Sequence, residues 1–115
     1  MLKPGPLTEQ SIDFSVQVVS YYRWLVQCRN EFVMSKQILR SGTSIGANIH
    51  EANFAVSKAD FVAKMQIALK ETSETEYWLV VLEKTDFLPQ EFRHLNDRCK
   101  SIKRMLISTL NTSKE

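Results

Sequence analysis

The stretch QILRSGTSIGANIHEA, residues 37–52, decides the fold class of this chain. Its apolar and small residues recur at alternating spacings of four and three, in the order Ile38, Gly42, Ile45, Ile49 and Ala52. That spacing places them on one face of an α-helix. The same alternation recurs in three other segments, between residues 14 and 28, 61 and 82, and 92 and 106. The sequence therefore predicts an all-α fold.

The four segments predict helices over about residues 8–29, 35–54, 58–85 and 89–110 of a single domain spanning residues 1–115. Thr8 and Ser35 are candidate N-caps, Ser57 with Asp60 forms a capping-box-like start, and Pro89 suits a first helical turn. The four-three alternation is typical of near-antiparallel helix packing, and the connections are short. We therefore predict an up-down-up-down antiparallel four-helix bundle.

Composition excludes several other classes. Among 115 residues, 43% are hydrophobic and 24% charged, which is typical of one globular domain. Three glycines and three prolines are too few for the turns of a many-stranded β fold. No apolar run or N-terminal apolar segment predicts a membrane span or a secretion signal, so we expect a cytoplasmic protein. Cys28 and Cys99 lack metal-site spacing, and we predict two buried free thiols.

Two of the helices carry more apolar surface than a single four-helix bundle needs. The excess forms second stripes on the first and third segments. They consist of Val19, Tyr22 and Val26, which Val33 would extend, then Ile67, Trp78 and Val81, and also Val62, Leu69 and Val80. Surplus apolar stripes favour burial against another copy of the chain. A bulky core with some exposed aromatic residues is the alternative.

Two motifs suggest catalysis or metal binding at first sight. Residues 42–46 match the GxSxG nucleophile elbow, but that motif requires a preceding strand and a distant histidine, whereas His50 is only six residues from Ser44. Glu91 and His94 form one ExxH pair, whereas a di-iron bundle requires two such pairs and two further glutamates. We therefore predict no catalytic residue, no cofactor and no metal ligand, and the chain is not expected to be an enzyme.

Gly42 and Gly46 also form a GxxxG pair. Each glycine inside a helix costs about 1 kcal/mol relative to alanine, and close approach of a neighbouring helix would offset that cost. We predict a continuous helix packed closely against its neighbour. A helix break near Ser41 and Gly42 is the alternative.

A ladder of polar side chains lies beside the apolar stripe of the second helix and faces acidic residues of the third. Buried polar groups must be paired, so this pattern favours hydrogen bonds between helices or between subunits, with a ligand site or a solvated face as alternatives. We expect Arg40 to pair with Glu71 or Glu74. The ladder consists of Arg40, Ser41, Ser44, Asn48, Glu51, Glu71 and Glu74.

The fourth helix is the basic one. The formal net charge is +2, and the surplus lies in residues 87–115, which carry six basic and three acidic side chains. A basic helix can follow nucleic-acid phosphates, although a charged outer face is also the usual solvated surface of a bundle. The candidate nucleic-acid contacts are Arg93, Arg98, Lys100, Lys103 and Arg104.

Residues 37–52, together with 57–61, 68–71 and 74–79, closely resemble one bacterial family, the four-helix-bundle proteins encoded in intervening sequences of 23S ribosomal RNA genes. That family is similar to the accessory protein of diversity-generating retroelements, a basic pentameric barrel that binds nucleic acid and a reverse transcriptase. The resemblance implies a bundle assembled as a homopentameric ring without established enzymatic activity. This chain is only weakly basic by comparison.

These observations predict a non-enzymatic oligomeric bundle that binds RNA, or an RNA–protein complex, through basic helical faces. The alternative is a protein-interaction scaffold with no nucleic-acid role. The expected partners are other copies of the chain, RNA or a nucleic-acid enzyme, and no membrane.

Overall fold

The computed structural model describes residues 5–113, so residues 1–4 and 114–115 of the predicted domain lie outside the described part. Its α-helices are α1 (Pro6–Arg29), α2 (Met34–Ala52), α3 (Lys58–Lys84) and α4 (His94–Ser113), and a short 3-10 helix, η1 (Gln90–Phe92), precedes α4. No strand occurs in residues 5–113. The predicted all-helical class is confirmed.

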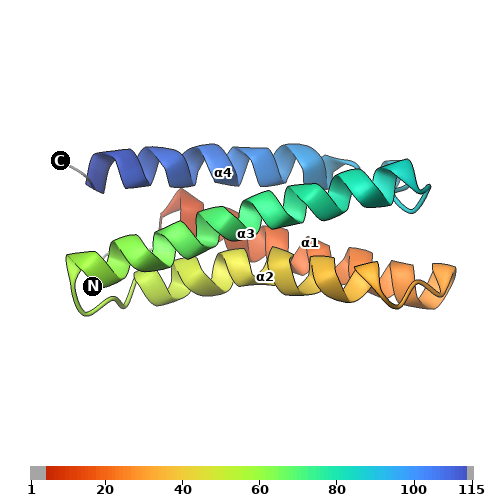
Figure 1. The fold of residues 1–115 in the computed structure, drawn as a ribbon, viewed down its shortest axis with the longest axis horizontal. Coiled ribbons are helices and arrows are strands. Elements are labelled where there is room, and N and C mark those ends of the chain that lie inside the picture. The colour runs from red at the N-terminus through yellow and green to blue at the C-terminus, as the bar shows by residue number, and fades with distance from the viewer. Residues whose placement is uncertain (1–4, 114–115) are drawn as a thin grey trace.

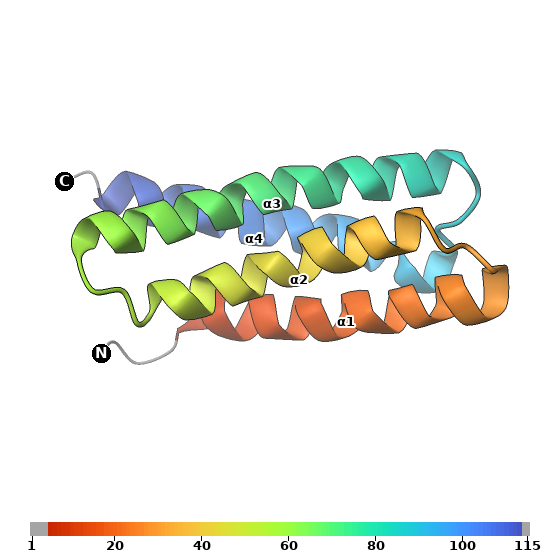
Figure 2. The ribbon, with the colours of Figure 1, turned by 60° about the horizontal axis from the view of Figure 1, so that its bottom comes forward.

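The four helices lie side by side and alternate in direction, as Figures 1 and 2 show. Each packs against two others, in the pairs α1–α2, α2–α3, α3–α4 and α4–α1. The chain measures 45 × 21 × 19 Å. The start of α1 and the end of α4 lie at the same end of the bundle (Figure 1). This is the up-down-up-down order; the ring of five chains stays a prediction.

The helix-period stripes form one continuous core between the four helices. Phe14, Val18, Tyr21 and Leu25 of α1 are at most 1% exposed. Cys99 is also buried, and burial raises the pKa of its thiol to about 12. The prediction of burial was wrong for Cys28, which is exposed. It lies in the last turn of α1, beyond Leu25, the final core residue of that helix, and therefore lies outside the packed core.

The first two helices begin differently from the prediction. Helix α1 starts at Pro6, whose fixed φ suits a first turn, so Thr8 lies inside the helix and is not its cap. Helix α2 starts at Met34, and Ser35 is already inside it. The backbone N–H of Ser35 instead donates to the carboxylate of Glu31 at 2.7 Å. A carboxylate from the preceding loop therefore caps α2, which also suits the helix dipole.

Helix α3 begins as predicted, and α4 does not. The hydroxyl of Ser57 accepts a hydrogen bond from the N–H of Asp60 at 3.0 Å. Pro89 precedes η1 in extended conformation, and α4 begins only at His94. The tight turn of η1 places the centroid of the Phe92 ring 5.0 Å from the centroid of the Tyr21 ring. The predicted helix start at Pro89 was wrong, because Pro89 has extended backbone and a 3-10 turn follows it before α4 begins.

Both glycines of α2 lie in an uninterrupted helix, so the predicted close packing is confirmed and the helix break is excluded. A Cβ atom on Gly42 would lie 2.9 Å from a methyl carbon of Val18. One on Gly46 would lie 3.0 Å from the hydroxyl oxygen of Ser15 and 3.2 Å from the carbonyl oxygen of Ser11. The close neighbour is α1. The GxSxG match lies within a helix and has no elbow geometry.

The surplus apolar surface is exposed at different residues from those predicted on α1. Ile12 and Val16 are 54% and 60% exposed, whereas Val19, Tyr22 and Val26 are half-buried. On α3, Ile67 and Val80 are exposed. The remaining members of the α3 stripes are half-buried, namely Val62, Leu69, Trp78 and Val81. The first three pack against the core. Within residues 5–113, no helix has the length and apolar character needed to cross a membrane.

Candidate nucleic-acid interface

The polar ladder joins α2 to α3. The buried hydroxyls of Ser41 and Thr75 are hydrogen-bonded to each other across the two helices at 3.0 Å. Glu51 forms an ion pair with Lys64 at 3.1 Å, and this contact raises the pKa of the lysine ammonium. Asn48 instead donates to the carbonyl of Ser44 within α2, at 2.8 Å. Within residues 5–113, Arg40, Ser41, Glu51, Glu71 and Glu74 thus make contacts between α2 and α3, so the ladder is largely a helix–helix contact.

Arg40 makes the ion pair expected of it. Its guanidinium contacts the carboxylate of Glu74 and lies 3.6 Å from that of Glu71. The indole N–H of Trp78 donates to the same Glu74 carboxylate at 3.3 Å. The side chain of Arg40 is 52% exposed, whereas those of Glu71 and Glu74 are 14% and 32% exposed, so the pair is partly solvated from the Arg40 side.

Because Arg40 is half exposed while its partners Glu71 and Glu74 are only 14% and 32% exposed, Arg40→Ala should lower the free energy of unfolding by about 1 kcal/mol, the upper end of the range for exposed pairs. A buried pair would instead cost about 3–5 kcal/mol when one partner is removed. Urea unfolding followed by circular dichroism measures the difference, with Arg23→Ala, at an exposed position of α1, as the control. A loss of several kcal/mol specific to Arg40→Ala would contradict this account.

Three of the five basic residues predicted to contact nucleic acid are tied to carboxylates of other helices. Arg98 forms an ion pair with Asp13 of α1. Lys103 pairs with Glu76 of α3 at 2.9 Å. Arg93 lies 3.9 Å from the carboxylate of Glu83, and its Nε donates to a loop carbonyl at 3.3 Å. These contacts reduce the charge that the three side chains present to a ligand.

The other two basic residues are free to meet an anion. Lys100 and Arg104 are exposed, and neither forms an ion pair within residues 5–113. They are four residues apart, so they lie on one flank of α4. Asp97, one turn before Lys100, is the acidic residue that interrupts this flank.

Two further exposed cations lie on α3 and were not predicted from the sequence. Lys70 and Lys84 are exposed and form no ion pair in the described part of the chain. Tyr77, 58% exposed, lies midway between them at spacings of seven, so all three share one row of the helix. Sequence reasoning missed this row because residues 57–86 carry a net negative charge. The glutamates of that segment are paired in the structure, with Arg40, Arg93 and Lys103.

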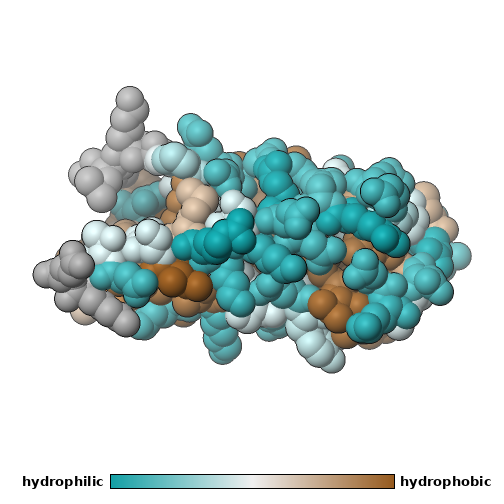
Figure 3. Space-filling view, turned by 90° about the horizontal axis from the view of Figure 1, so that it is seen from above, coloured by the Kyte–Doolittle hydropathy of each residue, from teal (hydrophilic) through white to brown (hydrophobic). Residues whose placement is uncertain are grey.

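Together these residues form what we call the α3–α4 face: Lys70, Tyr77, Lys84, Lys100 and Arg104. On α3 the row follows Gln66, which lines a cavity shared with α4. Glu76 and Glu83, each next to a member of the row, pair with Lys103 and Arg93. Figure 3, a view from the α4 side, shows a largely hydrophilic surface interrupted by separate hydrophobic patches.

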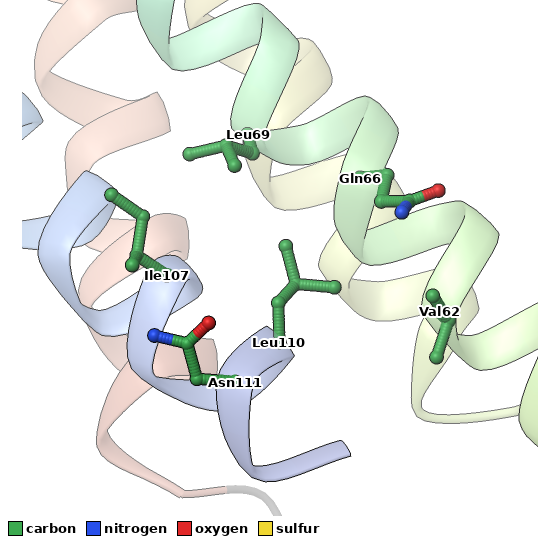
Figure 4. Close-up of a pocket in the computed structure, with 6 residues that line it drawn as sticks. All are labelled: Val62, Gln66, Leu69, Ile107, Leu110 and Asn111. Atoms are coloured by element: carbon green, nitrogen blue, oxygen red, sulfur yellow. The ribbon is translucent and has the colours of Figure 1, made fainter. Parts of the chain in front are cut away.

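A cavity of about 220 Å³ opens between α3 and α4, near the start of α3 and the end of α4. Figure 4 shows side chains from both helices around it, with Leu69, Ile107 and Leu110 bordering the gap. Two carboxamides complete its lining. The six lining residues are Val62, Gln66, Leu69, Ile107, Leu110 and Asn111.

In the described part of the chain, Tyr21 and the ExxH pair show no arrangement of catalytic or metal-binding groups. The buried hydroxyl of Tyr21 donates to the carbonyl of Phe87 at 2.7 Å, and burial raises its pKa. Glu91 and His94 are both exposed, and the ring of His94 contacts the side chain of Gln17 on α1. In residues 5–113, no three His, Cys, Asp or Glu side chains gather as a metal site would require.

Comparison with known proteins agrees with the resemblance of the central helices. The family model described as 23S rRNA-intervening sequence protein matches residues 6–108. A crystal structure of a protein with unknown function from the S23 ribosomal protein family of Bacteroides thetaiotaomicron is similar, with 50% sequence identity and a TM-score of 0.88. The match covers 91% of this chain and 95% of that one. No curated protein matches. The chain therefore belongs to the family of 23S rRNA-intervening sequence proteins.

Proposed function

We propose that this protein is a self-associating helical scaffold that binds RNA through the α3–α4 face. One observation carries the proposal: Lys70, Lys84, Lys100 and Arg104 have no carboxylate partner within residues 5–113, while Glu76 and Glu83 nearby are paired. Free cations can replace the counterions of a phosphate backbone without first breaking an ion pair. The exposed ring of Tyr77, between two of them, offers a surface on which an unpaired base can stack.

The size of this charge sets the expected strength of binding. Four phosphate contacts would make the logarithm of the binding constant fall with that of the salt concentration with a slope of about −3 to −4. Such a face binds weakly alone. Several copies joined in one assembly would bind the same RNA together, because later contacts become intramolecular.

The test compares wild type with Lys100→Glu/Arg104→Glu, titrated with a structured RNA at low and moderate salt. The variant should bind at least about tenfold more weakly, with a shallower salt dependence, because two phosphate contacts are lost and two negative charges added. Arg23→Glu/Lys36→Glu makes the same change of charge at exposed positions of α1 and α2 and should bind nearly as wild type.

Equal loss in both double variants would mean that only net charge matters. Equal binding by wild type and Lys100→Glu/Arg104→Glu, or no binding by wild type at low salt, would favour the second candidate, a protein-interaction scaffold. The exposed apolar side chains of Ile12 and Val16 support a protein contact, with another copy of the chain in the first candidate or with a different protein in the second.

A further inference from the structure

We propose that the cavity between α3 and α4 receives one unpaired nucleobase of the bound RNA; the inference rests on the proposed function and adds that the protein prefers single-stranded or bulged nucleotides. At about 220 Å³ the cavity is smaller than the roughly 300–1,000 Å³ of pockets that hold a whole drug-sized ligand. It suits one ring system better than a complete nucleotide.

The lining has the chemistry that a base requires. Val62, Leu69, Ile107 and Leu110 offer aliphatic walls to the faces of a flat ring. Gln66 and Asn111 each add a primary carboxamide, which presents a donor and an acceptor side by side. Carboxamides of this kind pair with the edges of bases, adenine above all. Proteins read RNA sequence mainly from such splayed-out bases.

Both carboxamides are available for a ligand. Neither side chain makes a hydrogen bond within residues 5–113, and both residues are exposed at the cavity rim. They come from different helices, Gln66 from α3 and Asn111 from α4, so a base between the two helices could meet one or both.

The free cations continue directly from the cavity. Lys100, Arg104, Ile107 and Asn111 are spaced by four, three and four residues, which places them along one flank of α4. At 1.5 Å per residue, Arg104 lies about 4.5 Å along the helix axis from Ile107, and Lys100 about 10.5 Å from it. A base in the cavity would thus carry its own and the adjoining phosphates toward these two cations.

Charge in this groove favours a nucleotide over an apolar side chain of a second copy. Glu76 follows the cavity on α3 and would repel phosphate, but Lys103 pairs with it at 2.9 Å. An apolar side chain of a second copy would contact only the aliphatic walls. The two carboxamides, and the cations Lys100 and Arg104, would then have no partner. A nucleotide uses all three kinds of group.

The experiment compares two RNAs with equal numbers of phosphates, a hairpin with an unpaired loop and a fully paired duplex, binding to wild type and to Gln66→Met/Asn111→Leu. This variant keeps charge and nearly keeps side-chain shape while removing both carboxamides. The variant's preference for the hairpin should be about tenfold smaller than that of wild type, since one good amide–base pairing gives discrimination of this order. Any preference that stacking on Tyr77 supplies stays the same in both proteins. Both should bind the duplex equally and with the same salt dependence.

A second readout reports the base itself. The fluorescence of 2-aminopurine in the loop should change when wild type binds and should change less with the variant, whose fold is checked by circular dichroism. A variant that keeps the hairpin preference, or a wild type that binds both RNAs equally, overturns the inference and leaves the proposed function standing. An unchanged preference accompanied by a smaller assembly mass would place a second copy in the cavity instead. Failure of wild type to bind either RNA at low salt overturns both.

Discussion

Gly46→Leu should destabilise the bundle by roughly 1–3 kcal/mol or more, because the space for its side chain is already occupied by α1. Its Cβ alone would lie 3.0 Å from the hydroxyl oxygen of Ser15 and 3.2 Å from the carbonyl oxygen of Ser11. A backbone carbonyl cannot rotate aside, so α1 must shift as a whole. The improved helix propensity, about 1 kcal/mol, only partly offsets this cost.

The matched control is Ala47→Leu, at the next position of the same helix, where the side chain is exposed. Its effect should stay within about 0.5 kcal/mol, as for most surface substitutions. Gly42→Ala should cost less than Gly46→Leu, because its closest neighbour is a methyl group of Val18, whose side chain can adjust. Urea unfolding monitored by circular dichroism compares all three. Wild-type stability of Gly46→Leu would show that the two helices can separate freely at this point.

We expect the protein to self-associate. Light scattering at tens of micromolar should give several times the chain mass of 13.3 kDa, and the family resemblance implies five chains. Ile12 and Val16 are 54% and 60% exposed one turn apart on α1, so they form a natural contact surface. Val16→Glu would introduce an unpaired charge into that contact, which is costly to bury. We expect the variant to shift toward single chains while remaining helical.

Ser20→Glu is the control for that experiment, because Ser20 is an exposed polar residue one turn further along α1. It should leave the mass unchanged. A wild type that scatters as one chain contradicts self-association. An assembled Val16→Glu would instead move the contact to another surface, such as the exposed Ile67 and Val80 of α3.

Helix periodicity was the most reliable guide to the fold, and helix ends were the least. The stripe from Phe14 to Leu25 is buried as its spacing predicted, since burial of one helical face repeats along the whole helix. Capping depends on single local contacts that compete with one another. Glu31 replaced Ser35 as the cap of α2, and the extended Pro89 followed by a 3-10 turn delayed the start of α4.

In the candidate site, too, some features could be predicted from the sequence and others could not. The basic character of α4 and the partner of Arg40 could be predicted, because both follow from residues at helical spacing on adjacent helices. Which cations remain free could not. Lys103 and Arg98 looked equivalent to Lys100 and Arg104 along the sequence, and only the neighbouring helices bring Glu76 and Asp13 against the first two.

By itself the sequence determined four amphipathic helices, their order, a tightly packed glycine pair and a family, because these depend on spacing within continuous segments. Only the tertiary structure decided that α1 is the close neighbour of Gly46, that Cys28 is exposed and that Arg40 is solvated. It also decided that α3 and α4 share a cavity. Each of these depends on the distance between residues far apart in the chain, which is set by how whole helices pack against one another and not by the pattern within any one of them.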